Sequence, residues 1–284
     1  MKSILAHQGS RNYLVFAKIY RGIAMSEPHL TLADVASVTQ PDNIRAIEWQ
    51  EEQPRTTLLH SHSQGQLIGS LAGMLSISTP LGWWVVPTSH AIWIPPNISH
   101  AVCSHGPFRG WSVYVSEPDC KKLRSTPQTL RVTTLLKELV HRVAFWNEKP
   151  RTEKQKRLGR IVIDEIGDLV EEPLGLSNPT DPRLRRIADA ILADLADTRS
   201  VEDLARWGGI SPRTLARRFQ AETGLGIVAW RQRARTLKAV TMLADGLGVT
   251  TVALDLGYSN VSAFIAMFRR VTGLTPGEYH HRQR

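Results

Sequence analysis

The chain has 284 residues, of which 42% are hydrophobic, and its formal net charge is +9. This length predicts two domains with a linking segment, and the apolar content excludes wholesale disorder. No apolar run approaches the roughly 18–20 residues that span a bilayer, and the N-terminal segment lacks the apolar core of a signal peptide, so we expect no membrane association.

The positive charge is unevenly distributed, and cysteines are few. From residue 181 onward there are 16 Lys and Arg against 10 Asp and Glu, a net charge of +6. This excess is consistent with an anionic partner, although a merely soluble basic surface would explain it about as well. Two cysteines, Cys103 and Cys120, do not make a disulfide framework. They indicate a reducing compartment, so we expect a cytoplasmic protein.

Residues 1–44 are predicted to be a tail of uncertain order, and residues 45–120 have the pattern of β-structure. Apolar and polar residues alternate there in short runs, and Gly or Pro interrupts the runs every eight to twelve positions. Aromatic and β-branched residues fill the runs, as in 83–86 and 111–115. Many short strands at regular spacing predict a small barrel or sandwich.

The β-region contains a group of candidate ligands. His60 and His62 are two residues apart, so on a strand both rings point to the same face, into a barrel if that face is inward. Gln66 and His100 complete the group. Three neutral imidazoles suit Zn, Fe, Ni or Cu, but an amide in place of a carboxylate weakens the binding of a divalent ion. A metal-free effector pocket and a metal site both remain open.

The spacing of these residues resembles two cupin motifs. His60-x-His62-x3-Gln66-x6-Gly73 resembles the first motif, with Gln66 where cupin enzymes usually have Glu. Residues 95–100 (PPNISH) resemble the second motif, with Asn97 in the usual Gly place. The resemblance implies a cupin-like barrel. Because no paired base or nucleophile lies nearby, we predict no catalytic residues, and a cupin dioxygenase or isomerase with a helical accessory domain is the alternative function.

From about residue 127 to 173 the pattern changes to helix. Apolar residues recur at helical spacing in 135–143 and again in 158–169. We therefore predict connecting helices over 121–173, which either cap the barrel or form the contact of a homodimer. A linker is predicted over 174–182, because residues 173–182 contain three prolines and a glycine.

Residues 183–284 are predicted to form an all-α domain with an internal repeat. The segment ARWGGIS (205–211) resembles ALDLGYS (253–259), and FQAETG (219–224) resembles FRRVTG (268–273). Each unit has the pattern of a helix that ends at a glycine, a short turn, and a second helix that begins at Ser and ends at Thr-Gly. These features indicate two helix-turn-helix motifs, at about 201–222 and 249–272, which is the motif that places a helix in the DNA major groove.

The second helix of the first motif is the strongest candidate for DNA contact. Leu215 and Phe219 share one face and should lie in the core, whereas Arg213 and Arg217 lie elsewhere on the helix, where arginine can reach guanine edges or phosphates. Seven basic residues and one acid lie between positions 211 and 238. Together with the repeat, this favours DNA contact over an ordinary solvated face.

Residues from about 184 to 282 resemble the DNA-binding domain of AraC/XylS-type transcription regulators. The matching segments are SPRTLARRF (211–219), DLGYS (255–259), AFIAMFRR (263–270) and GLTPGEY (273–279). The resemblance implies two recognition helices in adjacent major grooves, joined by a linker helix at roughly 227–244, and a cupin-like regulatory domain. The chain departs from the family at Ala266, where an Arg is frequent. We therefore expect Arg213 and Arg217 to make most base contacts, and the second motif mainly to contact phosphates.

The sequence thus predicts an α+β protein of two domains, with an N-terminal cupin-like barrel that senses an effector, connecting helices, and a C-terminal double helix-turn-helix domain. The predicted partners are double-stranded promoter DNA, a small-molecule effector and a second copy of the chain, with RNA polymerase as a further candidate. No cofactor is predicted, with a divalent metal as the alternative. A constitutive DNA-binding protein whose barrel only dimerises is a third possibility. The predicted DNA-binding residues are Arg213, Thr214, Arg217, Arg218, Gln220, Ser259, Asn260, Ser262, Arg269 and Arg270, and the effector or metal residues are His60, His62, Gln66 and His100.

Overall fold

The computed structural model describes residues 44–146, 152–172, 174–272 and 275–278. The predicted N-terminal tail therefore lies outside the described residues, apart from its last position. The chain divides into two compact units, one built on a sheet and one built of helices. An N-terminal sheet domain and a C-terminal helical domain are thus confirmed. The helical unit also includes the hairpin tip Ser78–Trp83, which the predicted contiguous boundaries did not foresee.

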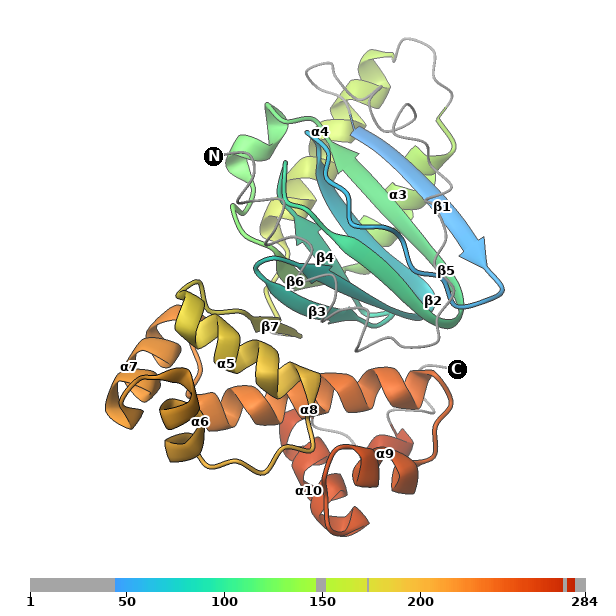
Figure 1. Cartoon of the computed structure of the whole chain (residues 1–284). Helices are drawn as coiled ribbons and strands as arrows, with labels where there is room; N and C mark the ends of the chain where they lie inside the picture. The colour runs from blue at the N-terminus through green and yellow to red at the C-terminus, as the bar shows by residue number, and fades with distance from the viewer. Residues whose placement is uncertain (1–43, 147–151, 173, 273–274, 279–284) are drawn as a thin grey trace. The chain divides into compact units, whose positions relative to one another are not determined.

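The sheet consists of long and short strands connected by turns (Figure 1). Its order is β1-β5-β2-β3-β7, and β4 pairs with both β2 and β6. The printed registers of β1 with β5, β2 with β4 and β4 with β6 are antiparallel. The strands are β1 (Ile44–Glu51), β2 (Gly65–Thr79), β3 (Gly82–Val86), β4 (His90–Ile94), β5 (Ala101–Val115), β6 (Gln128–Arg131) and β7 (Gly175–Ser177).

Among the described strands, the sheet does not close into a barrel, whereas the prediction of a cupin-like barrel implied closure. In the part of the chain that the structure describes, β1 pairs only with β5 and β6 pairs only with β4, so the sheet has ends and does not close on itself. The cause lies in β2, because this long strand divides its pairing between β5, β3 and β4 instead of passing the ladder once around a ring. The sheet branches at that strand.

The strands are also longer than predicted, because two glycines that look like turn residues lie inside them. A Cβ atom on Gly69 of β2 would lie 2.2 Å from the Trp111 ring, and one on Gly110 of β5 would lie 2.3 Å from the Phe108 ring. These glycines allow large aromatic rings to lie against the backbone, and they do not end the strand. Both β2 and β5 consequently extend over 15 residues.

Two helices pack against this sheet. Helix α3 (Thr134–Ala144) begins at Thr133, whose side chain accepts from the backbone of Leu136, and α4 (Glu153–Asp168) begins with a capping box. Their buried apolar side chains join strand residues such as Trp93 and Trp111 in one core cluster. The predicted helical segment 121–173 is partly wrong, because β6 lies within it and pairs with β4. Likewise β7 lies within the predicted linker.

The helical unit has six main helices among its described residues. Helix α7 begins at the cap residue Ser211 and ends at Gly224, which has a left-handed backbone with a φ of 75°. The core of this unit is formed by apolar side chains that include Leu215, Phe219 and Trp230. The helices are α5 (Pro182–Ala193), α6 (Val201–Gly208), α7 (Pro212–Thr223), α8 (Ile227–Ala244), α9 (Val249–Asp255) and α10 (Val261–Thr272).

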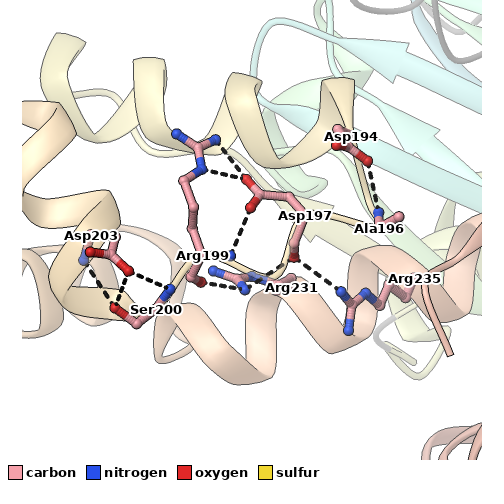
Figure 2. Close-up of polar contacts among 8 residues, drawn as sticks. All are labelled: Asp194, Ala196, Asp197, Arg199, Ser200, Asp203, Arg231 and Arg235. Carbon is pink, nitrogen blue, oxygen red and sulfur yellow. Dashed lines mark hydrogen bonds and ion pairs between the residues drawn. The ribbon is translucent and has the colours of Figure 1, made fainter. Parts of the chain in front are cut away.

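Arginines of α8 bind the loop between α5 and α6, as Figure 2 shows. Arg231 donates to the Arg199 carbonyl at 2.9 Å, and Arg235 donates to the Leu195 carbonyl at 2.7 Å and to the Asp197 carbonyl at 3.3 Å. Within the loop, the Arg199 guanidinium pairs with the Asp197 carboxylate at 2.6 Å. Two of the basic residues that suggested a DNA surface therefore hold the fold together.

Candidate nucleic-acid interface and effector site

Helix α7 separates a buried face from a charged one. Leu215 and Phe219 are 0% exposed. At 100° per residue, Arg213, Arg217 and Gln220 share a stripe on the opposite side of the helix, and all three are exposed. Within the described residues, neither arginine of this stripe has an ion pair or a side-chain hydrogen bond. Both guanidinium groups are therefore available to an external partner.

Two other predicted DNA-binding residues of α7 have structural partners. The Thr214 hydroxyl accepts a hydrogen bond of 2.8 Å from the Ser211 hydroxyl, within the cap of the helix. Arg218 pairs with Asp181, the N-cap of α5, at 2.8 Å, and lies 3.8 Å from Glu222. Because these carboxylates offset its charge, we expect Arg218 to contribute less to DNA binding than the two unpaired arginines.

The second candidate recognition helix, α10, has the same division into faces. Phe264, Met267 and Phe268 are buried, and the exposed stripe opposite them is Ser262, Ala266 and Arg269. The small apolar side chain of Ala266 lies in the middle of this stripe. Among the described side chains, this stripe contains one positive charge, Arg269, whereas the stripe of α7 contains two, Arg213 and Arg217.

The remaining predicted residues of the second motif lie at its ends. Asn260 caps α10, because its side-chain oxygen accepts from the Ala263 backbone at 2.7 Å. Ser259 precedes it and is exposed. Arg270 lies in α10, but its side chain is outside the described residues. The turn of each motif contains a glycine with a positive φ, Gly209 at 67° and Gly257 at 79°.

The four predicted effector-site residues come together in the sheet unit. His60 and His100 form an isolated antiparallel bridge, with hydrogen bonds of 3.0 Å and 2.8 Å between their backbones. The ring of His100 lies 4.4 Å from that of His60 and 5.1 Å from that of His62, measured between centroids. The side-chain oxygen of Gln66, on β2, lies 3.1 Å from Nε2 of both His62 and His100.

Burial lowers the pKa of two histidines of this cluster, His62 and His100. His100 is 0% exposed, and burial lowers its pKa to about 3. Burial also lowers the pKa of the His62 ring, although its hydrogen bond with Gln66 opposes the effect. Both rings are therefore neutral at pH 7. Burial raises the pKa of the neighbouring Tyr114 hydroxyl to about 12, so that this hydroxyl is neutral as well.

Sequence reasoning missed the residues that orient Gln66. Its side-chain amide donates to the Ser112 hydroxyl and to the Tyr114 hydroxyl, both at 3.0 Å. The alternation of β5 places these two hydroxyls on one face. However, no local pattern connects them with a residue more than forty positions earlier, so only the pairing of the strands reveals the contact.

Comparison with known proteins identifies the family. Residues 204–282 match a family model described as a helix-turn-helix domain. The chain is 30% identical to the HTH-type transcriptional regulator NimR of Escherichia coli (strain K12) over 225 residues, which are 79% of this chain and 82% of that protein. The chain belongs to the AraC/XylS family of transcription regulators.

Other members of the AraC/XylS family match over shorter stretches. The HTH-type transcriptional regulator RipA of Corynebacterium glutamicum is 34% identical over 147 residues, which are 49% of this chain and 43% of that protein. The arabinose operon regulatory protein of Escherichia coli (strain K12) is 27% identical over 106 residues, 37% of this chain and 36% of that protein.

Membership of the AraC/XylS family confirms two predictions. The protein is a DNA-binding transcription regulator, and it is not an enzyme. The alternative of a cupin dioxygenase or isomerase is therefore wrong. No helix among the described residues has the length and apolarity needed to cross a membrane.

In this AraC/XylS-family member, Ala266 is expected to limit the DNA affinity of the second recognition helix, α10. Ala266→Arg adds a cation to the exposed stripe of α10, so DNA affinity should rise several-fold, and the slope of log K against log[salt] should steepen by about 1. The matched control is Ala263→Arg, because Ala263 is also exposed but lies beside the stripe. Binding isotherms over a salt series check the prediction, and equal effects of the two substitutions would contradict it.

Proposed function

We propose that this regulator binds promoter DNA with α7 in one major groove, making the base contacts, and α10 in the next, contacting mainly the backbone. The observation that carries the proposal is the stripe Arg213–Arg217–Gln220, in which two unpaired guanidinium groups lie opposite the buried face of α7. Arginine can donate two hydrogen bonds to a guanine edge, and glutamine can pair with adenine in the same way. A helix face that contacts only water would not require side chains that make paired hydrogen bonds to bases.

The sheet unit is proposed to be the sensing domain. It contains a group of polar side chains, His60, His62, Gln66 and His100, of which Gln66 and His100 are buried and the other two are partly buried. A buried polar cluster of this kind is a costly feature unless its groups are satisfied by a partner. A bound effector can shift the active population only by as much as its affinity differs between the two states.

We further propose that the protein is a cytoplasmic homodimer whose contact is formed by α3 and α4. Large apolar side chains point away from the core there: Leu135 is 53% exposed, Phe145 is 71% exposed and Ile161 is 47% exposed. Large exposed apolar side chains on two helices that pack together are suited to a protein interface. RNA polymerase is a candidate partner of the DNA-bound dimer.

The proposed cytoplasmic location is supported by the two cysteines. Cys103 and Cys120 are both free thiols, as is usual in a reducing compartment.

The test of the DNA-binding proposal is selection of fragments from the protein's own genome, including the DNA that flanks its gene. The purified full chain should enrich particular fragments over an excess of random competitor, and the affinity should fall steeply between about 50 and 200 mM salt. Absence of enrichment of any fragment would contradict sequence-specific binding. A double Arg213→Ala/Arg217→Ala variant that enriches the same fragments as strongly would contradict the role of α7.

A further inference from the structure

The three histidines of the sensing cluster are held with the same ring nitrogen turned away from the cluster. Nδ1 of His60 contacts the Leu58 carbonyl at 2.8 Å, Nδ1 of His62 contacts the Gln64 carbonyl at 2.9 Å, and Nδ1 of His100 contacts the Ile98 carbonyl at 2.9 Å. A carbonyl oxygen only accepts hydrogen bonds, so each Nδ1 must carry a proton. A neutral imidazole has a single N–H group, so in the neutral form of each ring Nε2 presents a lone pair.

These lone pairs meet a fourth one. Both N–H bonds of the Gln66 amide are used by hydroxyls of β5, so its oxygen faces Nε2 of His62 and Nε2 of His100 at 3.1 Å without a proton between them. Nε2 of His60 has no hydrogen-bond partner among the described residues. One ring nitrogen from each histidine lies within 4.8 Å of the other two. Four acceptors thus converge, and no donor to them is found among the described residues.

A cation is the natural complement of such a group. Placing a second proton on each ring would instead gather three positive charges within a few ångströms of one another, at a partly buried place. An ion about 2.1 Å from a nitrogen and an oxygen, at a bond angle between 90° and 109°, separates those two atoms by about 3.0–3.4 Å. The separations of 3.1 Å between the Gln66 oxygen and Nε2 of His62 and of His100 fall within that range. The ring nitrogens lie up to 4.8 Å apart, so the rings must move to within about 4.2 Å of one another when an ion binds all three.

We propose that His60, His62, His100 and Gln66 bind one divalent transition-metal ion of the class of Zn²⁺, Co²⁺ and Ni²⁺. Imidazole nitrogens select these ions over Mg²⁺ and Ca²⁺, which take oxygen ligands. The site has the outer contacts that metal ligands need, because backbone carbonyls orient all three rings and the β5 hydroxyls orient the amide. His60 and His62 are only partly buried, so an ion can enter from solvent, whereas His100 forms the buried floor.

One metal-free arrangement competes with this site. Turning the Gln66 amide by 180° would let its N–H groups donate to His62 and His100 while its oxygen accepts from the two β5 hydroxyls. That arrangement leaves Nε2 of His60 without a donor. It also makes opposite predictions for a carboxylate at position 66, since a carboxylate cannot donate, and the experiment uses this difference.

The experiment uses the full chain, stripped with a chelator and dialysed. Titration with Co²⁺ should produce visible d–d absorption that saturates at one ion per chain, and elemental analysis after addition of Zn²⁺ should give the same stoichiometry. His62→Ala removes a partly buried ligand and should weaken Zn²⁺ binding more than about 100-fold, measured by competition with a chromophoric chelator. The matched control is His141→Ala, because the His141 side chain lies on α3 outside the cluster and is 57% exposed. It should bind as the wild type does.

Gln66→Glu is the decisive variant. It supplies an anionic ligand while the β5 hydroxyls can still donate to it, so Zn²⁺ should bind at least about 10-fold more tightly than in the wild type. Three results would each overturn the proposed metal site. They are weaker Zn²⁺ binding by Gln66→Glu than by the wild type, less than one Zn²⁺ per wild-type chain, and unchanged Zn²⁺ binding by His62→Ala. The proposal rests on the proposed function only in taking this unit as the sensing domain. If the protein enriches DNA fragments but does not bind metal, the DNA-binding proposal is retained and the metal-site proposal is wrong.

Discussion

Arg217→Ala is expected to weaken binding to the selected DNA by on the order of 1–3 kcal/mol and to relax the preference at one base position. The reason is that the Arg217 side chain is exposed on α7, has no internal partner, and lies on the stripe opposite the buried Leu215 and Phe219. An arginine that donates two hydrogen bonds to guanine loses that discrimination on truncation. Competition binding against a library with each operator position varied in turn measures both effects.

Two controls make this result specific. Arg218→Ala removes a neighbouring arginine whose charge is offset by Asp181 and Glu222, so it should weaken binding less and leave the sequence preference unchanged. Arg109→Ala removes an exposed charge on β5, outside both recognition helices and outside α3 and α4, and should change neither affinity nor preference. An unchanged base preference in Arg217→Ala would show that another residue makes the base contact.

Trp230→Ala is expected to destabilise the helical unit by about 3–5 kcal/mol, which is typical for the loss of a fully buried Trp. The ring is 0% exposed, packs edge-on against Phe219 of α7 with centroids 5.5 Å apart, and donates from Nε1 to the Ser177 carbonyl at 2.8 Å. Truncation therefore creates a cavity and leaves a carbonyl without its donor. Because Phe219 anchors α7, DNA affinity should fall in parallel.

Urea denaturation followed by circular dichroism at 222 nm checks this prediction. Trp207→Ala is the control, because Trp207 is 41% exposed and lies under the Arg186 guanidinium at 4.3 Å. That variant should lose only about 0.5–1 kcal/mol. A Trp230→Ala protein that unfolds at the same urea concentration as the wild type would mean that the ring is not part of the core.

The sequence predicted the helical unit well because its signals are local. Ser211 and Gly224 mark the ends of α7 by chemistry confined to one turn of helix. The linker helix that the family resemblance implied at roughly 227–244 has the same bounds as α8. The surface was harder to predict. Arg231 and Arg235 bind carbonyls of a loop some 35 residues earlier in the chain, and neither composition nor periodicity contains that information.

The sheet unit was predicted less well because strand pairing is not local. Gly69 and Gly110 have the composition of turns, but they lie under aromatic rings that arrive from a partner strand or a neighbouring residue. The division of β2 between several partners cannot be read from alternation, so the barrel was expected to close. The histidine cluster was predicted from motif spacing, whereas the hydroxyls that orient Gln66 became visible only through the fold.

Helix α8 fixes the distance between the two recognition helices. It contains 18 residues and is therefore about 27 Å long, somewhat shorter than one turn of B-DNA, which is about 34–36 Å. Its arginines tie it to the loop that precedes the first motif, so the helix is stiff at that end. The operator of such a protein can change by single base substitutions during evolution. With both recognition helices on the DNA, as proposed, the operator cannot gain or lose a base pair between the two contacted segments without rotating one of them away from its helix. The spacing should therefore change far more slowly during evolution than the bases.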